Sequence, residues 1–171
     1  MDVFECIRQR RSIRAYQDRP VPEDALRQIL EAINAAPSAG NLQAYQVFLV
    51  RDAAKRRALA QASGDQEFVA QAPVVLVFCT DAARSAWRYG QRGERLYALQ
   101  DATIACAYAQ LAAVALGLGT VWVGAFQDEA VIRALNLPHG LHPIAILPIG
   151  YPAESPAPTP RRALSDLVQT V

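Results

Sequence analysis

The chain has 171 residues, and its 17 Lys and Arg side chains nearly balance its 16 Asp and Glu side chains, for a formal net charge of +1. Such a balanced charge gives no field of one sign that would hold nucleic acid or an anionic lipid surface, so neither partner is expected. No apolar run reaches the roughly 18 residues needed to span a bilayer. The length suits one compact domain, and we expect residues 1–171 to fold as a single unit.

The sequence lacks the usual marks of export, disulfide bonding and metal binding. Its first residues mix acids and bases where a signal peptide needs an apolar stretch, which favours a cytoplasmic protein. Cys6, Cys79 and Cys106 are odd in number and lie far apart in apolar surroundings, which is typical of buried thiols. His139 and His142 have no Cys or carboxylate at ligand spacing, so no metal site is expected.

The first half of the chain predicts helices and buried strands in alternation. We expect a helix over 3–9, an amphipathic helix from 23 that Pro37 ends, a strand over 45–50, a helix capped by Asp52 and a strand over 73–79. The amphipathic helix is indicated by apolar residues at 26, 29, 30 and 33, which form one stripe at helical spacing.

The second half continues the alternation. We expect a long Ala-rich helix over about 94–116, strand-like residues at 120–126, a short helix over 128–135, a core strand over 144–149 and an extended arm from about 150. Gly117 is a natural cap for the long helix, and Gly124 interrupts the strand-like segment. Together the two halves predict a mixed layer of helices and strands.

Two basic segments are candidates for binding a phosphate. Arg10, Arg11, Ser12 and Arg14 place three guanidiniums and a hydroxyl within five residues, and guanidiniums present forked donors that suit phosphate oxygens. Arg161-Arg162, at the far end of the Pro-rich arm, could close over the same group. The alternative is a solvated basic turn and tail, which spacing alone favours.

A loop of small and amide residues at 36–43 is a second candidate. Its small residues let backbone approach a flat ligand, while Ser38, Asn41 and Gln43 supply donors and acceptors. An ordinary turn after a helix would have a similar composition, so the residues alone favour neither interpretation.

The glycine-rich segment 117–124 is not a dinucleotide fingerprint. It carries Trp122 where GxGxxG needs glycine, and it follows a helix rather than a strand. Gly124 could let backbone amides approach a ring, whereas a Trp in an apolar strand is more often part of the core.

The chain resembles the FMN-dependent nitroreductase family from about Phe4 to Arg162. The resemblance lies in four segments and their order: the RRSIR motif, the APSAGNLQ loop, the GLG turn, and the PIGYP segment before a basic tail. The resemblance implies an α+β fold of three layers, with helices on both faces of a mainly antiparallel sheet. It also implies a homodimer built on the long central helix, with FMN at the interface.

The resemblance also assigns cofactor-binding residues. The phosphate and ribityl chain would be bound by Arg10, Arg11, Ser12, Arg14 and either Arg161 or Arg162. The flavin of the partner subunit would be contacted by Pro37, Ser38, Ala39, Asn41 and Gln43. The backbone amides near flavin N5 would be those of Val123 and Gly124, with Leu118 and Gly119 at the adjoining turn. No side chain is expected to act as the catalytic acid.

The implied activity is hydride transfer from NADH or NADPH, through the flavin, to a small acceptor such as a nitroaromatic or quinone, with ping-pong kinetics. Residues 84–93 would form the lid, where Trp87, Arg88, Tyr89 and Arg92 shape the substrate pocket or simply lie on an exposed helix. Two alternatives stay open: a specialised flavin-fragmenting, dehalogenating or dehydrogenating relative, and a non-enzymatic flavin-binding protein.

Overall fold

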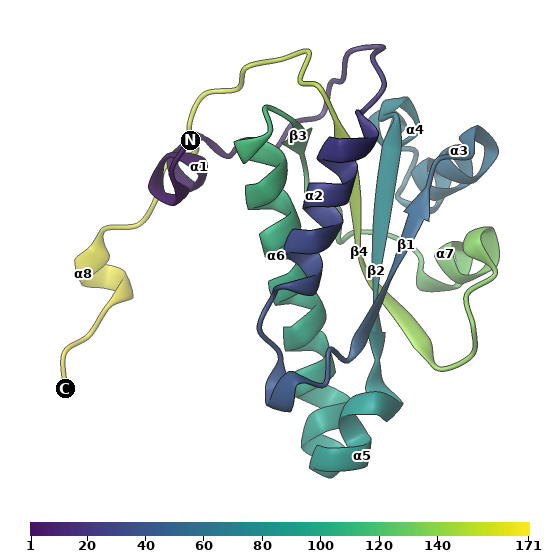
Figure 1. Ribbon diagram of the computed structural model, residues 1–171, viewed down its shortest axis with the longest axis vertical. Coiled ribbons are helices and arrows are strands. Elements are labelled where there is room, and N and C mark those ends of the chain that lie inside the picture. Colours follow the sequence, from purple (N-terminus) through teal and green to yellow (C-terminus); the bar gives the residue numbers. More distant parts are fainter.

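A four-stranded sheet forms the centre of the computed structural model, which describes residues 1–171 (Figure 1). The strands are β1 (Tyr45–Val50), β2 (Val74–Asp81), β3 (Gly119–Thr120) and β4 (Leu141–Gly150). They pair in the order β1-β2-β4-β3, and every pairing is antiparallel.

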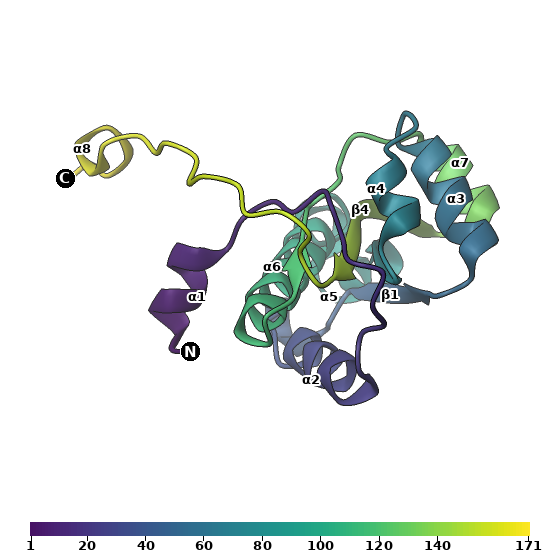
Figure 2. The same cartoon turned by 90° about the horizontal axis from the view of Figure 1, so that it is seen from above.

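Helices cover the two faces of this sheet. The helices of the chain are α1 (Val3–Gln9), α2 (Glu23–Asn34), α3 (Ala53–Ala62), α4 (Glu67–Gln71), α5 (Ala82–Arg92), α6 (Ala98–Ala115), α7 (Asp128–Leu135) and α8 (Leu164–Leu167), with short helical turns η1 (Ala39–Asn41) and η2 (Gly93–Tyr97), and α1 and α8 project away from the sheet (Figure 2). In Figure 2, α2 and α6 lie on one side of the sheet and α3, α4 and α7 on the other.

The alternation of side chains along β2 explains the three layers. Residues such as Leu76 and Phe78 pack in one apolar cluster with α2 and α6. Their neighbours Val75 and Val77 point to the opposite face and pack with α3, α4 and α7. Because β2 is buried on both faces, it reads as a continuous apolar run, and the predicted three-layer α+β fold is confirmed.

Several elements have the bounds that the sequence predicts. Helix α1, strand β1 and helix α7 match, and the Asp52 side chain caps α3 by accepting a hydrogen bond from the Lys55 amide at 2.8 Å. All three cysteines are free and buried, as expected. No helix combines the length and the apolar character that crossing a bilayer requires.

The expectation that residues 45–50 form a buried strand is only half right. Strand β1 is at the edge of the sheet, where Val50 is buried and Leu49 is 41% exposed. An apolar run predicts a strand, but its position in the sheet depends on pairing that the run does not encode.

The expected strand over 120–126 is regular only to Thr120, although Val123 still pairs with β4. Residues after β3 leave the ladder, and Val123 makes a single bridge back to Ile146 of β4, with two backbone hydrogen bonds of 3.0 Å. On its other side, Thr120 accepts a hydrogen bond from the Ile13 amide at 3.0 Å. The N-terminal segment therefore takes the position beside β3 that a longer sheet would use.

The long helix starts later than predicted. Residues Gly93–Tyr97 form a π-helical turn between α5 and α6, and α6 itself begins at Ala98. A side chain at Gly93 would place its Cβ 2.5 Å from the Ser85 carbonyl oxygen, so only glycine allows this close approach. Helices α4 and α8 and the turn η1 are short elements that the sequence patterns do not predict.

Stability should depend far more on β2 than on β1. Replacing Phe78, which is 0% exposed, with Ala should lower the free energy of unfolding by about 3–5 kcal/mol, because it opens a cavity in the α2-α6 layer. The matched change Leu49→Ala on the edge strand should cost only about 0.5 kcal/mol. Urea denaturation of both variants checks this, and equal losses would contradict the layer assignment.

Candidate functional site

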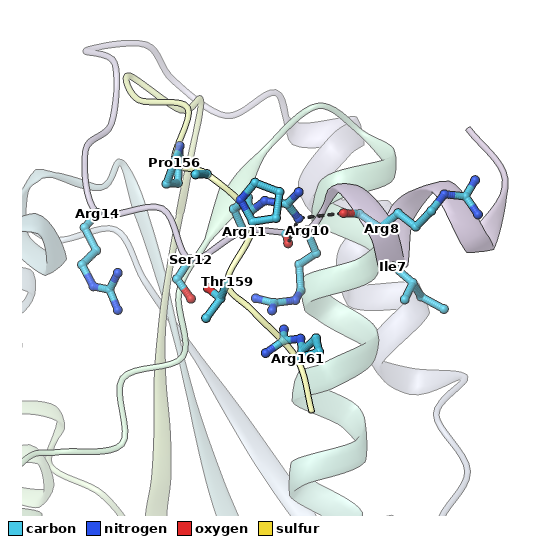
Figure 3. Close-up of a pocket in the computed structure, with 11 residues that line it drawn as sticks. Ile7, Arg8, Arg10, Arg11, Ser12, Arg14, Pro156, Thr159 and Arg161 are labelled. Carbon is cyan, nitrogen blue, oxygen red and sulfur yellow. Dashed lines mark hydrogen bonds between the residues drawn. The ribbon is translucent and has the colours of Figure 1, made fainter. Parts of the chain in front are cut away.

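An arginine-lined cleft lies between the N-terminal segment and the C-terminal arm. It encloses about 380 Å³ and is lined by Ile7, Arg8, Arg10, Arg11, Ser12, Arg14, Pro156, Ala157, Pro158, Thr159 and Arg161. Figure 3 shows the guanidinium groups of Arg10 and Arg161 next to each other, with Ser12 and Thr159 beside them. We call this the arginine cleft.

Local interactions fix the N-terminal wall of the arginine cleft. The Asp2 side chain caps α1, and the Arg11 guanidinium donates to the carbonyl oxygens of Arg8 (2.7 Å) and Arg10 (2.8 Å) at the other end of this helix. The segment then runs against β3, where Gly119 leaves room for Ile13: a Cβ at Gly119 would lie 2.7 Å from the Ile13 side chain. Arg11 and Gly119 therefore shape the wall of the cleft.

The charge of the arginine cleft is unbalanced. No acidic side chain lines it, and none of the four ion pairs of the structure involves its arginines. The pKa of Arg10 is lowered by burial, and further by the positive charges of Arg161 and Arg11. Glu154, which does not line the cleft, accepts a hydrogen bond from the Arg14 amide. Crowded cations without counter-charges are the setting in which an anion binds well.

The structure distinguishes the two C-terminal arginines. Arg161 lines the cleft and lowers the pKa of Arg10 by its charge, whereas Arg162 does neither. The sequence alone does not decide between these two neighbours.

The loop at 36–43 lines a second, larger cleft beside α6. This cleft encloses about 670 Å³ and is lined by Pro37, Ser38, Ala39, Tyr97, Leu99, Gln100, Asp101, Thr103 and Ile104. Asn41 and Gln43 belong to the same loop but lie outside this lining, and Gln43 donates from its side chain to the Asn34 oxygens at 3.2 and 3.0 Å. Asp101 was not among the predicted residues, although an acid within an apolar, Ala-rich helix is a signal that could have found it.

The two clefts lie at opposite ends of α6. Arg11 and Ile13 line a small pocket together with Val114, which is near the C-terminal end of α6. The Ala39 amide is hydrogen-bonded to Asp101, which lies in the first turn of α6. Thirteen residues of helix separate these points, about 20 Å at the usual rise of 1.5 Å per residue. Figure 1 shows the same separation along the vertical axis of the molecule. One chain therefore does not bring the two predicted segments together.

The amides at Val123 and Gly124 differ in availability. The Val123 N–H donates to the Ile146 carbonyl, so it has no hydrogen left for a ligand. The Gly124 N–H makes no hydrogen bond within the chain, and the residue is exposed. Leu118 and Gly119, the other predicted residues of this region, lie beside the arginine segment instead.

The four predicted lid residues line neither cleft. Trp87 is 82% exposed on α5, while the Tyr89 ring packs edge-on against Tyr97 with ring centres 5.1 Å apart. Arg88 donates to the Gly40 carbonyl at 3.5 Å, and Arg92 donates to the Tyr97 hydroxyl at 2.9 Å. Their role in substrate binding stays a prediction.

Two of the three buried thiols, those of Cys79 and Cys106, are poor nucleophiles in this structure. Burial raises the pKa of Cys79 to about 12 and raises the pKa of Cys106 still further. Both thiols therefore stay protonated at neutral pH, and thiolate chemistry is not available at either position.

The chain is similar to known proteins in sequence and in fold. A sequence profile of the Nitroreductase family matches residues 7–67 and 62–151. An NAD(P)H FMN reductase of Bacillus subtilis is 36% identical over 94% of this chain and 70% of its own length, and an NADH dehydrogenase of Thermus thermophilus is 35% identical over 98% and 95%. The solved structure of an NADPH:FMN oxidoreductase from Vibrio harveyi, complexed with NAD+, superposes with a TM-score of 0.90 at 30% identity, covering 98% of this chain and 76% of that one.

The arginine cleft should bind a simple anion. Inorganic phosphate at several times its Kd should raise Tm by about 2–4 °C above chloride at equal ionic strength, because bound phosphate relieves the repulsion around Arg10. The variant Arg161→Gln should lose most of this rise, whereas Arg162→Gln should keep it. Thermal melts of the three proteins check this, and equal behaviour of the two variants would contradict the assignment of Arg161.

Proposed function

Since this chain belongs to the nitroreductase family, we propose that it is an FMN-dependent NAD(P)H oxidoreductase that reduces a small organic acceptor such as a nitroaromatic or quinone. The observation that carries the proposal is the arginine cleft, where unpaired guanidiniums surround a space that an anionic group would fill. The family supplies the identity of that anion, the phosphate of FMN.

The residues of the cleft fit the phosphate end of FMN. Arg10, Arg14 and Arg161 supply charge and forked donors, and the Ser12 hydroxyl supplies a further donor. Arg11 holds α1 with its guanidinium and so acts mainly on the shape of the site. Bound FMN supplies the two-electron chemistry, and the protein orients it and limits access to its reactive face.

The remaining contacts follow from groups that are free to make them. The exposed Gly124 N–H is available to donate to the N5 edge of the flavin, so we assign that contact to Gly124 rather than to Val123. Pro37, Ser38 and Ala39 line an open cleft wide enough to take a ring. No side-chain acid is required in this scheme, because the nearby groups orient the ring rather than exchange protons.

A homodimer would complete the site. The arginine cleft and the loop at 36–43 lie about 20 Å apart along α6, so two antiparallel copies of this helix would bring one of each together. Helix α1 exposes Val3, Phe4 and Ile7, and α8 exposes Leu164 and Leu167, on segments that project from the body (Figure 2). Apolar side chains on projecting segments are typical of surfaces that a partner covers.

The donor and the acceptor would use the same open face in turn, which gives ping-pong kinetics. NADH and NADPH are both candidate donors, since the related enzymes carry either name. The single domain over 1–171 and the cytoplasmic location, both inferred from the sequence, stay predictions.

The first test is a visible absorption titration. Purified protein with added FMN should show bound flavin bands that bleach anaerobically with about one equivalent of NADH or NADPH per flavin, as a two-electron transfer requires. Absence of bound flavin would overturn the proposal. Bound flavin that stays oxidised with both donors would favour the non-enzymatic interpretation.

The second test asks whether the site is shared between two copies. Arg10→Ala removes a cleft cation and Ala39→Phe fills the loop cleft, so each variant alone should bind FMN poorly. After the two variants are mixed and allowed to exchange subunits, about a quarter of the wild-type sites should return, because each heterodimer holds one intact site. FMN fluorescence quenching measures the recovery. No recovery in a mixture shown to contain heterodimers would place both segments in the site of one chain.

A further inference from the structure

Asp101 is a buried carboxylate without a cationic partner. It lies in the first turn of α6 and is only 2% exposed. None of the ion pairs of the structure includes it. A buried charge is costly unless hydrogen bonds satisfy its oxygens, so its bonding partners indicate what it does.

Both oxygens of Asp101 accept hydrogen bonds from the backbone of the loop at 36–43 and its end. Oδ1 accepts from the Ala39 amide at 2.9 Å, and Oδ2 accepts from the Ala44 amide at 3.3 Å. These amides lie on either side of residues 40–43, so one carboxylate links the two ends of the turn by hydrogen bonds. Charge-assisted bonds of this kind are the stronger hydrogen bonds of proteins.

The loop needs such a link because its backbone is unusual. Gly40, Asn41 and Gln43 all have left-handed φ angles, of 56°, 56° and 48°. Non-glycine residues rarely adopt this conformation, so the loop would sample other shapes if nothing held it.

Two arginine side chains of helix α5 donate hydrogen bonds to carbonyl groups of the same loop. The Arg84 side chain donates to the Leu42 oxygen, and Arg88 donates to the Gly40 oxygen at 3.5 Å. Charged side chains from two helices therefore form hydrogen bonds with the loop. An acid of α6 accepts from its N–H groups, and two arginines of α5 donate to its C=O groups. Of these, Asp101 is the buried one that also lines the cleft with Ser38 and Ala39.

We propose that Asp101 is a positioning residue of the cofactor site, whose carboxylate holds the loop at 36–44 in its flavin-binding shape before the flavin arrives. The inference rests on the proposed function, since it concerns the loop that would contact the ring. Asp101 acts through the Ala39 and Ala44 amides and need not touch the flavin itself. Its loss would lower affinity by letting the loop move.

The test is Asp101→Asn, which preserves size but removes one acceptor. The new amide must turn an N–H toward one of two backbone N–H groups, so at least one bond is lost. We expect the Kd for FMN, measured by fluorescence quenching on folded protein, to rise about tenfold or more. The visible circular dichroism of bound FMN should change, and hydrogen exchange of the backbone amides at 38–45 should speed up. Asp101→Glu, which keeps the carboxylate, should restore part of the affinity.

Asp52→Asn is the matched control. Asp52 also accepts a backbone amide hydrogen bond, as the cap of α3, so its loss should cost stability without changing the Kd for FMN. Equal FMN affinity and equal circular dichroism in wild type and Asp101→Asn would overturn the inference and leave the proposed function intact. Failure of the wild type to bind FMN would instead overturn the proposed function. Should Asp101→Asn not fold, exchange in wild type decides: amides of Ala39 and Ala44 that exchange fast without FMN would contradict a pre-formed loop.

Discussion

Both faces of β2 are covered by helices, and this burial sets the position of every segment of the candidate site. The strand pairs with β1 on one edge and β4 on the other, while α6 and α2 pack on the face that carries Phe78. Small side chains let α6 pack closely along its length, since Ala102, Ala105, Ala109 and Ala113 are all buried. The first turns of this helix line the cleft beside the loop at 36–43, whereas the arginine cleft is lined by the N-terminal segment and the C-terminal arm near the other end of the helix.

Helix α6 separates the two halves of the candidate site, and the two halves differ in charge and in backbone conformation. At one end, unpaired guanidiniums crowd together and depress the pKa of Arg10, which suits an anion. At the other end, a loop with left-handed residues is held by a buried acid and exposed bases, which suits a flat ligand that needs fixed backbone. A ligand with a charged end and a flat end, such as FMN, needs both, and in the proposed homodimer a second copy of the chain would supply the missing half.

Much of this organisation could be predicted from the sequence. The short apolar runs, the helical stripe of α2 and the caps at Asp52 and Gly117 predict the elements, and the arginine motif predicts the candidate anion site. The failures have physical causes. The edge position of β1 depends on strand pairing, and so does the length of β3, because the ladder with β4 is interrupted after Thr120 and resumes only as a single bridge at Val123. Asp101 was missed because its importance lies in two amides more than 50 residues away, Ala39 and Ala44.

The sequence by itself determined the family and, through that resemblance, the three-layer fold, because both depend on the order of short motifs. It also supplied the residue types that we propose meet a phosphate. Tertiary structure decided which of those residues are free to act. It assigns the guanidinium of Arg11 to α1 and that of Arg161 to the cleft, and it uses the Val123 amide in a bridge while leaving Gly124 unpaired. The sequence shows which hydrogen-bond donors the chain has. Whether each donor already has a partner depends on neighbours that only folding brings into contact.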